Sequence, residues 1–250
     1  MSDGLYVYAI GRAGHPLPEG IESIESGPLA AFYKPVVLEE YSQEAIDARA
    51  GDVEWLGAIG YRHQSVMNDL MRGGTIIPLR AFSLYSGADV LKAQLENNAG
   101  MYARILERLD GKQEWTLRIE FEPEAWSNAL IGRVESLREL AAEAEQASSG
   151  KAFLLRKKLD EEKKRVSREA EQQVAAEIER AVIDKLACDT VAETRQQRSG
   201  AFPQINVLIN RDEEAVLQEV ADRYSGEGIV VAITGPWPPY SFAGTMGDDR

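Results

Sequence analysis

The alternation of hydrophobic and charged residues in "EWTLRIEF" (114–121) predicts a β-strand with one buried face. Its hydrophobic positions are Trp115, Leu117, Ile119 and Phe121. The stretches "LYVYAI" (5–10) and "INVLIN" (205–210) are rich in residues that favour strands, so we expect a strand at each. "GIVVAITG" (228–235) is nearly continuous in apolar residues, which predicts a central strand covered on both faces.

The first part of the chain mixes strand and helix signals. Its expected elements are a short β-meander at 21–38, a helix capped by Asp52 and running to about Met71, a strand in "TIIPLRAFSLY" (75–85) and a helix over about 88–109. Pro78 lies inside the last of these strands and indicates an edge position or a bulge. We therefore predict an N-terminal α+β domain over residues 1–112.

Helical spacing dominates the middle of the chain. The first apolar stripe is Trp126, Leu130, Val134, Leu137, Ala141 and Ala144. After "ASSGK" a second stripe follows, namely Leu155, Leu159, Val166, Ala170, Val174, Ile178, Val182 and Leu186. Two stripes joined by a short Ser/Gly turn predict an antiparallel helical hairpin over about 124–198 that packs mostly within one chain. With the strands and the helix that follow, it forms a predicted C-terminal α+β domain over residues 113–250.

Charge changes the list of expected partners. The chain of 250 residues carries 28 Lys and Arg against 41 Asp and Glu, a net charge of −13. Residues 151–198 hold 12 basic and 10 acidic side chains, so the rest of the chain, with 16 against 31, carries −15. Such a surface repels nucleic acid and anionic membranes, and we expect neither as a partner. The mixed signs of "RKKLDEEKKR" (156–165) are typical of a solvated helix face.

Candidate chemistry is sparse. Of the two histidines, His15 lies in a Gly/Pro-rich loop, and His63 lies on a predicted helix, where a hydrogen-bonded structural role is favoured over a catalytic base. The single cysteine, Cys188, has no evident histidine partner and fits a reducing cytosol. Known catalytic and phosphate-binding motifs are absent from the sequence. We expect no enzyme, no cofactor and no metal site; an enzyme would have to use His63, Arg80 and Tyr85.

Two segments combine proline with large aromatic rings, "GTIIPLRAFSLYSG" (74–87) and "GPWPPYSF" (235–242). Because proline fixes φ and lacks an N–H group, both segments form stiff ends to their strands. We expect their rings to fold back over the sheet, those of 235–242 over the last strand and the 212–225 helix, and secondarily to form an interaction surface. The candidate structural and interaction residues are Tyr6, Tyr8, Pro78, Arg80, Phe82, Pro236, Trp237, Pro238, Pro239, Tyr240 and Phe242.

Several motifs in order along the chain resemble the gas vesicle protein family GvpL/GvpF. They are "LYVYAI", the histidine helix leading into "IIPLRAFSLYSG", "LDGKQEWTLRIEF", "GKAFLLRKKLDEE" and the terminal "GPWPPYSF". One departure concerns the loop after Pro78, where many members read roughly "PLRFGT". Here the aromatic residue is displaced by one position to Phe82, and the glycine is missing. The motifs do not separate an L-type from an F-type member.

The resemblance implies a non-enzymatic accessory protein of the gas vesicle, located inside the cell, that contacts the main shell protein and other accessory proteins. It also implies two α+β domains, the first a ferredoxin-like variant and the second carrying a coiled-coil-like hairpin. We expect the main shell contact in the N-terminal domain, at the edges formed by "LYVYAI" and "TIIPLRAF". The alternative interpretation is a small-molecule-binding or regulatory α+β module.

Overall fold

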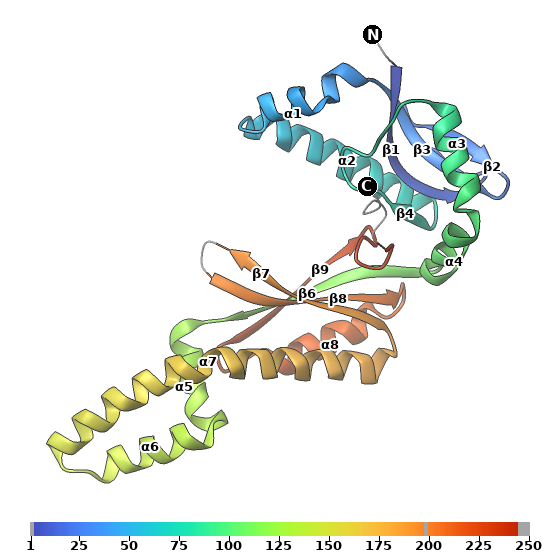
Figure 1. Cartoon of the computed structure of the whole chain (residues 1–250). Coiled ribbons are helices and arrows are strands. Elements are labelled where there is room, and N and C mark those ends of the chain that lie inside the picture. The colour runs from blue at the N-terminus through green and yellow to red at the C-terminus, as the bar shows by residue number, and fades with distance from the viewer. Residues whose placement is uncertain (1–2, 198–199, 245–250) are drawn as a thin grey trace. The chain divides into compact units, whose positions relative to one another are not determined.

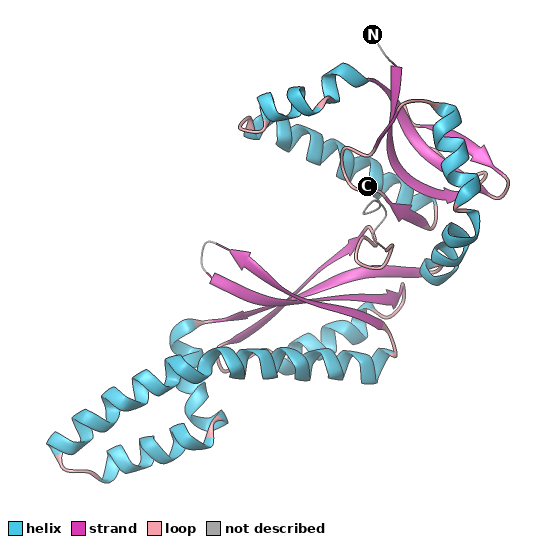
Figure 2. Ribbon diagram, in the orientation of Figure 1, coloured by secondary structure: helices cyan, strands magenta, loops and turns pink. Residues whose placement is uncertain are grey.

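The computed structural model describes residues 3–197 and 200–244 and has the expected mixed α+β composition, with two sheets and several helices (Figures 1 and 2). The chain divides into two compact units. Unit 1 contains the residues up to Gln113 and those from Pro236 onward, and unit 2 is Glu114–Gly235. The predicted domain 113–250 therefore needs correction, because the chain returns to unit 1 after Gly235. The reason is that buried Phe242 packs under the guanidinium of Arg108, and that Tyr240 bonds to His63.

The sheet of unit 1 has the strand order β2-β3-β1-β4. These strands are β1 (Asp3–Arg12), β2 (Glu22–Ser26), β3 (Leu29–Val37) and β4 (Ile76–Pro78), and the short β5 (Leu84–Tyr85) also pairs with β1. The predicted meander and the strand at "LYVYAI" are confirmed. The expectation that "LYVYAI" forms an edge is wrong, because β1 lies between β3 and β4.

The helices of unit 1 include the two that the sequence predicts, the second of them split, and two short ones before them that it does not predict. They are the 3-10 turn η1 (Leu38–Tyr41), α1 (Gln43–Arg49), α2 (Val53–Gly73), α3 (Ala88–Asn97) and α4 (Ala99–Leu109). Asp52 caps α2 as predicted, since its carboxylate accepts the Trp55 N–H at 3.0 Å. The single helix expected over 88–109 is split at Asn98, whose backbone leaves the helical region (φ −111°, ψ 13°).

The sheet of unit 2 has the order β7-β8-β6-β9. Its strands are β6 (Lys112–Phe121), β7 (Asp189–Gln197), β8 (Gly200–Asn210) and β9 (Ile229–Trp237). The hydrophobic face predicted for β6 is confirmed, because Trp115, Leu117 and Ile119 are buried in one core. The opposite face is not simply exposed, since Glu114 and Thr116 are buried as well. The prediction that the last strand is central is wrong. β6 and β8 take the central places, β9 lies at an edge, and Val230 is 38% exposed.

The helices of unit 2 are α5 (Pro123–Arg133), α6 (Glu135–Gln146), α7 (Ser149–Leu186) and α8 (Glu214–Tyr224). Figure 1 shows α6 lying antiparallel beside the first half of α7. The apolar stripe of α7 is buried from Leu159 to Leu186, as its spacing predicts. The predicted bounds 124–198 need correction: Val134 is extended and breaks the first arm, and left-handed Ala187 ends the second, after which β7 begins.

None of the helices in the described parts of the chain combines the length and the apolar character that a membrane crossing requires.

Candidate functional site

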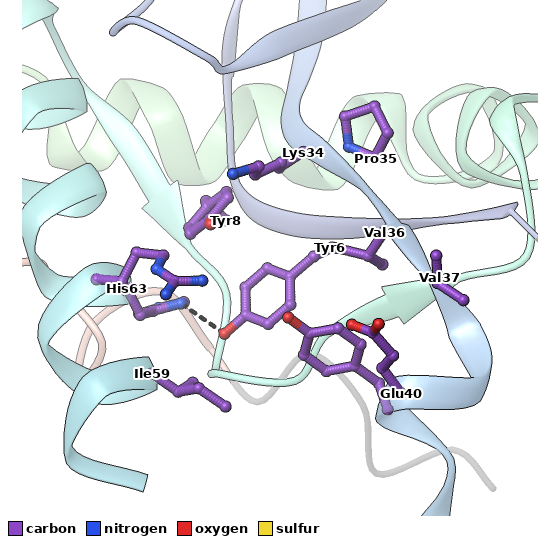
Figure 3. Close-up of a pocket in the computed structure, with 11 residues that line it drawn as sticks. Tyr6, Tyr8, Lys34, Pro35, Val36, Val37, Glu40, Ile59 and His63 are labelled. Atoms are coloured by element: carbon purple, nitrogen blue, oxygen red, sulfur yellow. Dashed lines mark hydrogen bonds between the residues drawn. The ribbon is translucent and has the colours of Figure 1, made fainter. Parts of the chain in front are cut away.

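A pocket of about 390 Å³ opens in unit 1 between the sheet, η1 and α2 (Figure 3). Aromatic rings, aliphatic side chains and three charged groups line it together. The lining residues are Tyr6, Tyr8, Lys34, Pro35, Val36, Val37, Glu40, Tyr41, Ile59, Arg62 and His63. A concave site that mixes apolar walls with a few polar groups is the usual form of a binding site for a small ligand or a side chain.

Strand geometry places the tyrosines of the pocket. Tyr6 and Tyr8 are two positions apart on β1, so their side chains point to the same face of the sheet. Both are 4% exposed, and their rings lie 4.9 Å apart between centroids. Lys34 is directly opposite Tyr6 in the register of β1 with β3, which brings its side chain to the same face.

His63 on α2 lies at the centre of a chain of hydrogen bonds. Its Nδ1 is 3.0 Å from the hydroxyl of Tyr6, and its Nε2 is 3.0 Å from the hydroxyl of Tyr240. The Phe82 N–H donates to the Tyr6 hydroxyl at 3.1 Å. The buried Tyr6 proton finds an acceptor when it is donated to Nδ1. This assignment leaves the proton of the neutral imidazole on Nε2, which donates it to Tyr240.

Burial keeps this network neutral near pH 7. It lowers the pKa of His63, against the opposing effect of a backbone hydrogen bond to Leu79. It also raises the pKa of Tyr6 and of Tyr240 to about 12 each. Because both ring nitrogens of His63 are engaged by neutral hydroxyls, the histidine holds three segments together. His63 is hydrogen-bonded on a helix, as the sequence predicts.

Phe82 adopts a left-handed backbone with φ 66°, a conformation that favours glycine. Its ring lies within about 6.5 Å of the rings of Tyr6, Tyr41 and Trp55, at 6.5, 6.4 and 6.2 Å between centroids. Position 82 corresponds to the glycine of the "PLRFGT" pattern, and glycine is the residue that this backbone conformation favours. In this chain the strained backbone carries an aromatic ring into the cluster instead.

The structure brings Tyr6, Tyr8, Phe82 and Tyr240 of the predicted residues to one place. The others are more scattered. Pro78 is buried in β4 opposite Ala9, Arg80 is exposed, Pro236 and Trp237 are exposed, and Pro238, Pro239 and Phe242 are buried.

The expectation that the rings of "GPWPPYSF" cover the second sheet is wrong. Trp237 is 40% exposed, whereas Phe242 is 2% exposed and contacts Arg108 of unit 1. Gly235 lies within β9, where φ is 144° and any side chain would meet the ring of Trp115. Unit 2 ends at this glycine, and the chain belongs to unit 1 from Pro236 onward.

Sequence reasoning missed Lys34, Tyr41, Trp55 and Arg62, which lie far apart along the chain and share no local motif. Arg62 precedes His63, and that adjacency is the only signal that could have found it. Of the trio considered for an enzyme, Tyr85 pairs with Leu5 across the sheet and Arg80 is exposed, whereas His63 is buried. Within residues 3–197 and 200–244, no group of three or more His, Cys, Asp or Glu side chains could hold a metal ion.

The family model of the gas vesicle synthesis protein GvpL/GvpF matches residues 4–244. The chain belongs to the GvpL/GvpF family. It is 30% identical to gas vesicle protein L of Streptomyces sp. (strain CB03234), over 98% of this chain and 94% of the relative. It is 27% identical to gas vesicle protein F of the same strain, over 95% and 98%.

Two solved structures show the same fold. The crystal structure of GvpF from Anabaena sp. PCC7120 matches with a TM-score of 0.64 at 16% identity, over 100% of this chain and 99% of that one. GvpF from Microcystis aeruginosa matches with a TM-score of 0.60 at 15% identity, over 97% and 99%. Membership of a gas vesicle family over nearly the whole chain supports a role in gas vesicle formation.

Proposed function

We propose that this protein is a non-enzymatic structural or assembly accessory of gas vesicles, and that unit 1 contacts the main shell protein. It acts inside the cell, at the gas vesicle, together with other accessory proteins. Family membership supports the setting. The engagement of both nitrogens of His63 by neutral tyrosines supports a role without catalysis.

The observation that carries the assignment to unit 1 is its cluster of aromatic side chains around an open pocket. Tyr6 and Tyr8 line the pocket, and Phe82 and Tyr240 bond to its lining residues. Exposed Arg62 lies at the same site. Tyrosine, tryptophan and arginine are the residue types that most often carry binding energy at protein interfaces.

The test is capture of co-expressed main shell protein by the full chain. Fragments are unsuitable, because a cut near Gln113 removes Tyr240 and Phe242 from unit 1. Arg62→Glu reverses a charge at the pocket, and Arg156→Glu makes the same change at an exposed position on α7. We expect Arg62→Glu to lose the shell protein and Arg156→Glu to retain it. Equal retention by both variants, or selective loss with Arg156→Glu, contradicts the assignment.

The second candidate, a small-molecule-binding or regulatory module, is favoured by the pocket itself, whose volume lies in the usual range for ligand sites. A melting screen of the full chain with small acids, amines and nucleotides tests it. Stabilisation by one class favours this function, and the absence of any ligand-dependent shift removes it.

We also infer that unit 1 is a variant of the ferredoxin-like fold. Its strand order, 2-3-1-4, supports this, and the variation is that a turn replaces the helix between the first two strands. The side-by-side packing of α6 and α7 supports a coiled-coil-like hairpin in unit 2.

A further inference from the structure

We infer that the pocket of unit 1 binds a carboxylate group carried on a small apolar body. The inference concerns this pocket alone. It goes beyond the proposed contact with the shell protein and holds whether or not that contact exists.

The first observation is the hydroxyl of Tyr8. Tyr8 is 4% exposed and lines the pocket, between Lys34 and His63 in Figure 3. Its hydroxyl makes no hydrogen bond to any residue that the structure describes, whereas the hydroxyl of neighbouring Tyr6 has two partners. The fully buried polar atoms that lack a partner do not include this hydroxyl, so it opens to the pocket and is free to donate a hydrogen bond to a ligand atom there.

The second observation is the charge beside that hydroxyl. Lys34 and Arg62 both line the pocket, and in the described part of the chain neither forms an ion pair with a carboxylate. The charge of Arg62 acts on Tyr8, where it opposes the rise in pKa that burial causes. A guanidinium group offers two parallel donors that match a carboxylate, and the Tyr8 hydroxyl adds a third.

The remaining lining selects the kind of anion. Val36, Val37 and Ile59 form apolar walls that suit an aliphatic or aromatic body. Glu40 lines the same pocket, and the chain carries a net charge of −13, so a dianion such as phosphate is repelled more strongly than a single carboxylate. The volume of about 390 Å³ limits the ligand to a small molecule or to one or two residues of a peptide.

A matched pair of probes tests the inference on the full chain by NMR titration or calorimetry. 4-Methylpentanoate and 4-methylpentanamide share one apolar body and differ in charge. We expect the acid to bind at least about tenfold more tightly than the amide, because a hydrogen bond to a charged group is worth about 1.5 to 3 kcal/mol. Tyr8→Phe should lower the affinity for the acid by about tenfold, because it removes one of these hydrogen bonds.

Tyr33→Phe is the matched control. Tyr33 lies on the adjacent strand β3, and its hydroxyl donates to Glu22 at an exposed position outside the pocket. This variant should bind 4-methylpentanoate as the unmodified chain does. Because the Tyr8 hydroxyl has no partner within the described chain, Tyr8→Phe should fold normally, which circular dichroism checks.

Arg62→Gln provides a second variant with the same expected loss of binding.

The carboxylate could belong to a free acid or to a segment of another protein, and three peptides separate these sources. They are N-acetyl-Leu-Leu with a free C-terminus, the same peptide amidated, and N-acetyl-Leu-Glu-Leu-amide. Tighter binding of either acidic peptide than of 4-methylpentanoate assigns the site to a protein terminus or to an acidic side chain, and the reverse assigns it to a free acid.

The inference is overturned if no carboxylate probe binds saturably, if acid and amide bind equally, or if Tyr8→Phe and Arg62→Gln both bind like the unmodified chain. No shell protein is present in these titrations, so such a failure leaves the proposed shell contact standing. A failure of the shell-protein capture likewise leaves the carboxylate site intact.

Discussion

The two units share one strand order and differ in what connects their strands. Numbered within each unit, both sheets run 2-3-1-4. Between the first and second strands, unit 2 inserts helices α5 to α7, whereas unit 1 has a loop between Arg12 and Glu22. The long α7 buries an aliphatic stripe in the core of unit 2. In unit 1 no such helix is present, and the pocket remains between α2, β3 and η1.

The two units therefore hold their elements together by different kinds of contact. Unit 2 relies on aliphatic side chains that repeat along one helix, so its stability depends on a continuous local pattern. Unit 1 joins β1, α2, the loop at Phe82 and the C-terminal segment through hydroxyls and one imidazole. A buried polar network of this kind is specific in geometry, and the loss of one member leaves others unsatisfied.

The largest expected loss of stability comes from disrupting the aliphatic packing of α7 in unit 2. Leu159→Asp with Val174→Asp places two charges in the buried stripe of α7 and should lower the free energy of unfolding by more than about 4 kcal/mol. Phe153→Asp with Leu154→Asp is the control on the same helix, where the side chains are 68% and 65% exposed. Urea unfolding followed by circular dichroism measures both. Similar midpoints for the two double variants contradict the packing of α7.

The next effect concerns the segment that returns to unit 1. Phe242 is 2% exposed, and its truncation to alanine should cost about 3 to 5 kcal/mol. Trp237 is 40% exposed, so Trp237→Ala should cost less than about 2 kcal/mol despite the larger ring. Thermal melting of the two variants ranks them. A greater loss with Trp237→Ala means that the segment covers the sheet of unit 2 instead.

The stability against unfolding should depend on pH through unit 1, which contains both histidines. Burial lowers the pKa of His63 and of His15 in the folded state. The unfolded chain therefore binds more protons once the pH falls below about 6.5, and stability present above that pH is lost as the pH falls toward the folded-state pKa. Urea midpoints between about pH 7.5 and 5.5 measure the loss. His63→Gln and His15→Gln should each reduce this slope, and an unchanged slope in the double variant refutes the assignment.

The smallest expected effect lies at Phe82. Both Phe82→Ala and Phe82→Gly lose the ring, but only glycine relieves the left-handed backbone. Phe82→Gly should therefore be more stable than Phe82→Ala by about 1 kcal/mol. Chemical denaturation of the pair measures the difference. An alanine variant as stable as the glycine variant would show that the backbone at this position is relaxed.

The sequence predicts single elements in both units better than it predicts how they are joined, for a physical reason. Alternation in β6 and helical spacing in α7 are local patterns that directly reflect which face is buried. The breaks at Val134 and Asn98 follow from single backbone angles and leave no mark on that spacing. Tyr6 and Tyr8 could be singled out because they alternate on one strand. Their joining to His63 and Tyr240 could not, since it depends on contacts between residues 57 and 177 positions apart.

The central structural claim is that His63 joins β1 to the C-terminal segment as a neutral imidazole with its proton on Nε2. Histidine-selective ¹⁵N NMR of the full chain near neutral pH tests it most directly, with His15→Gln to assign the signals. The account predicts an unprotonated Nδ1 and a protonated Nε2 for His63, and a shift of the Nε2 signal in Tyr240→Phe. A mixture of tautomers that is insensitive to Tyr240→Phe would contradict it.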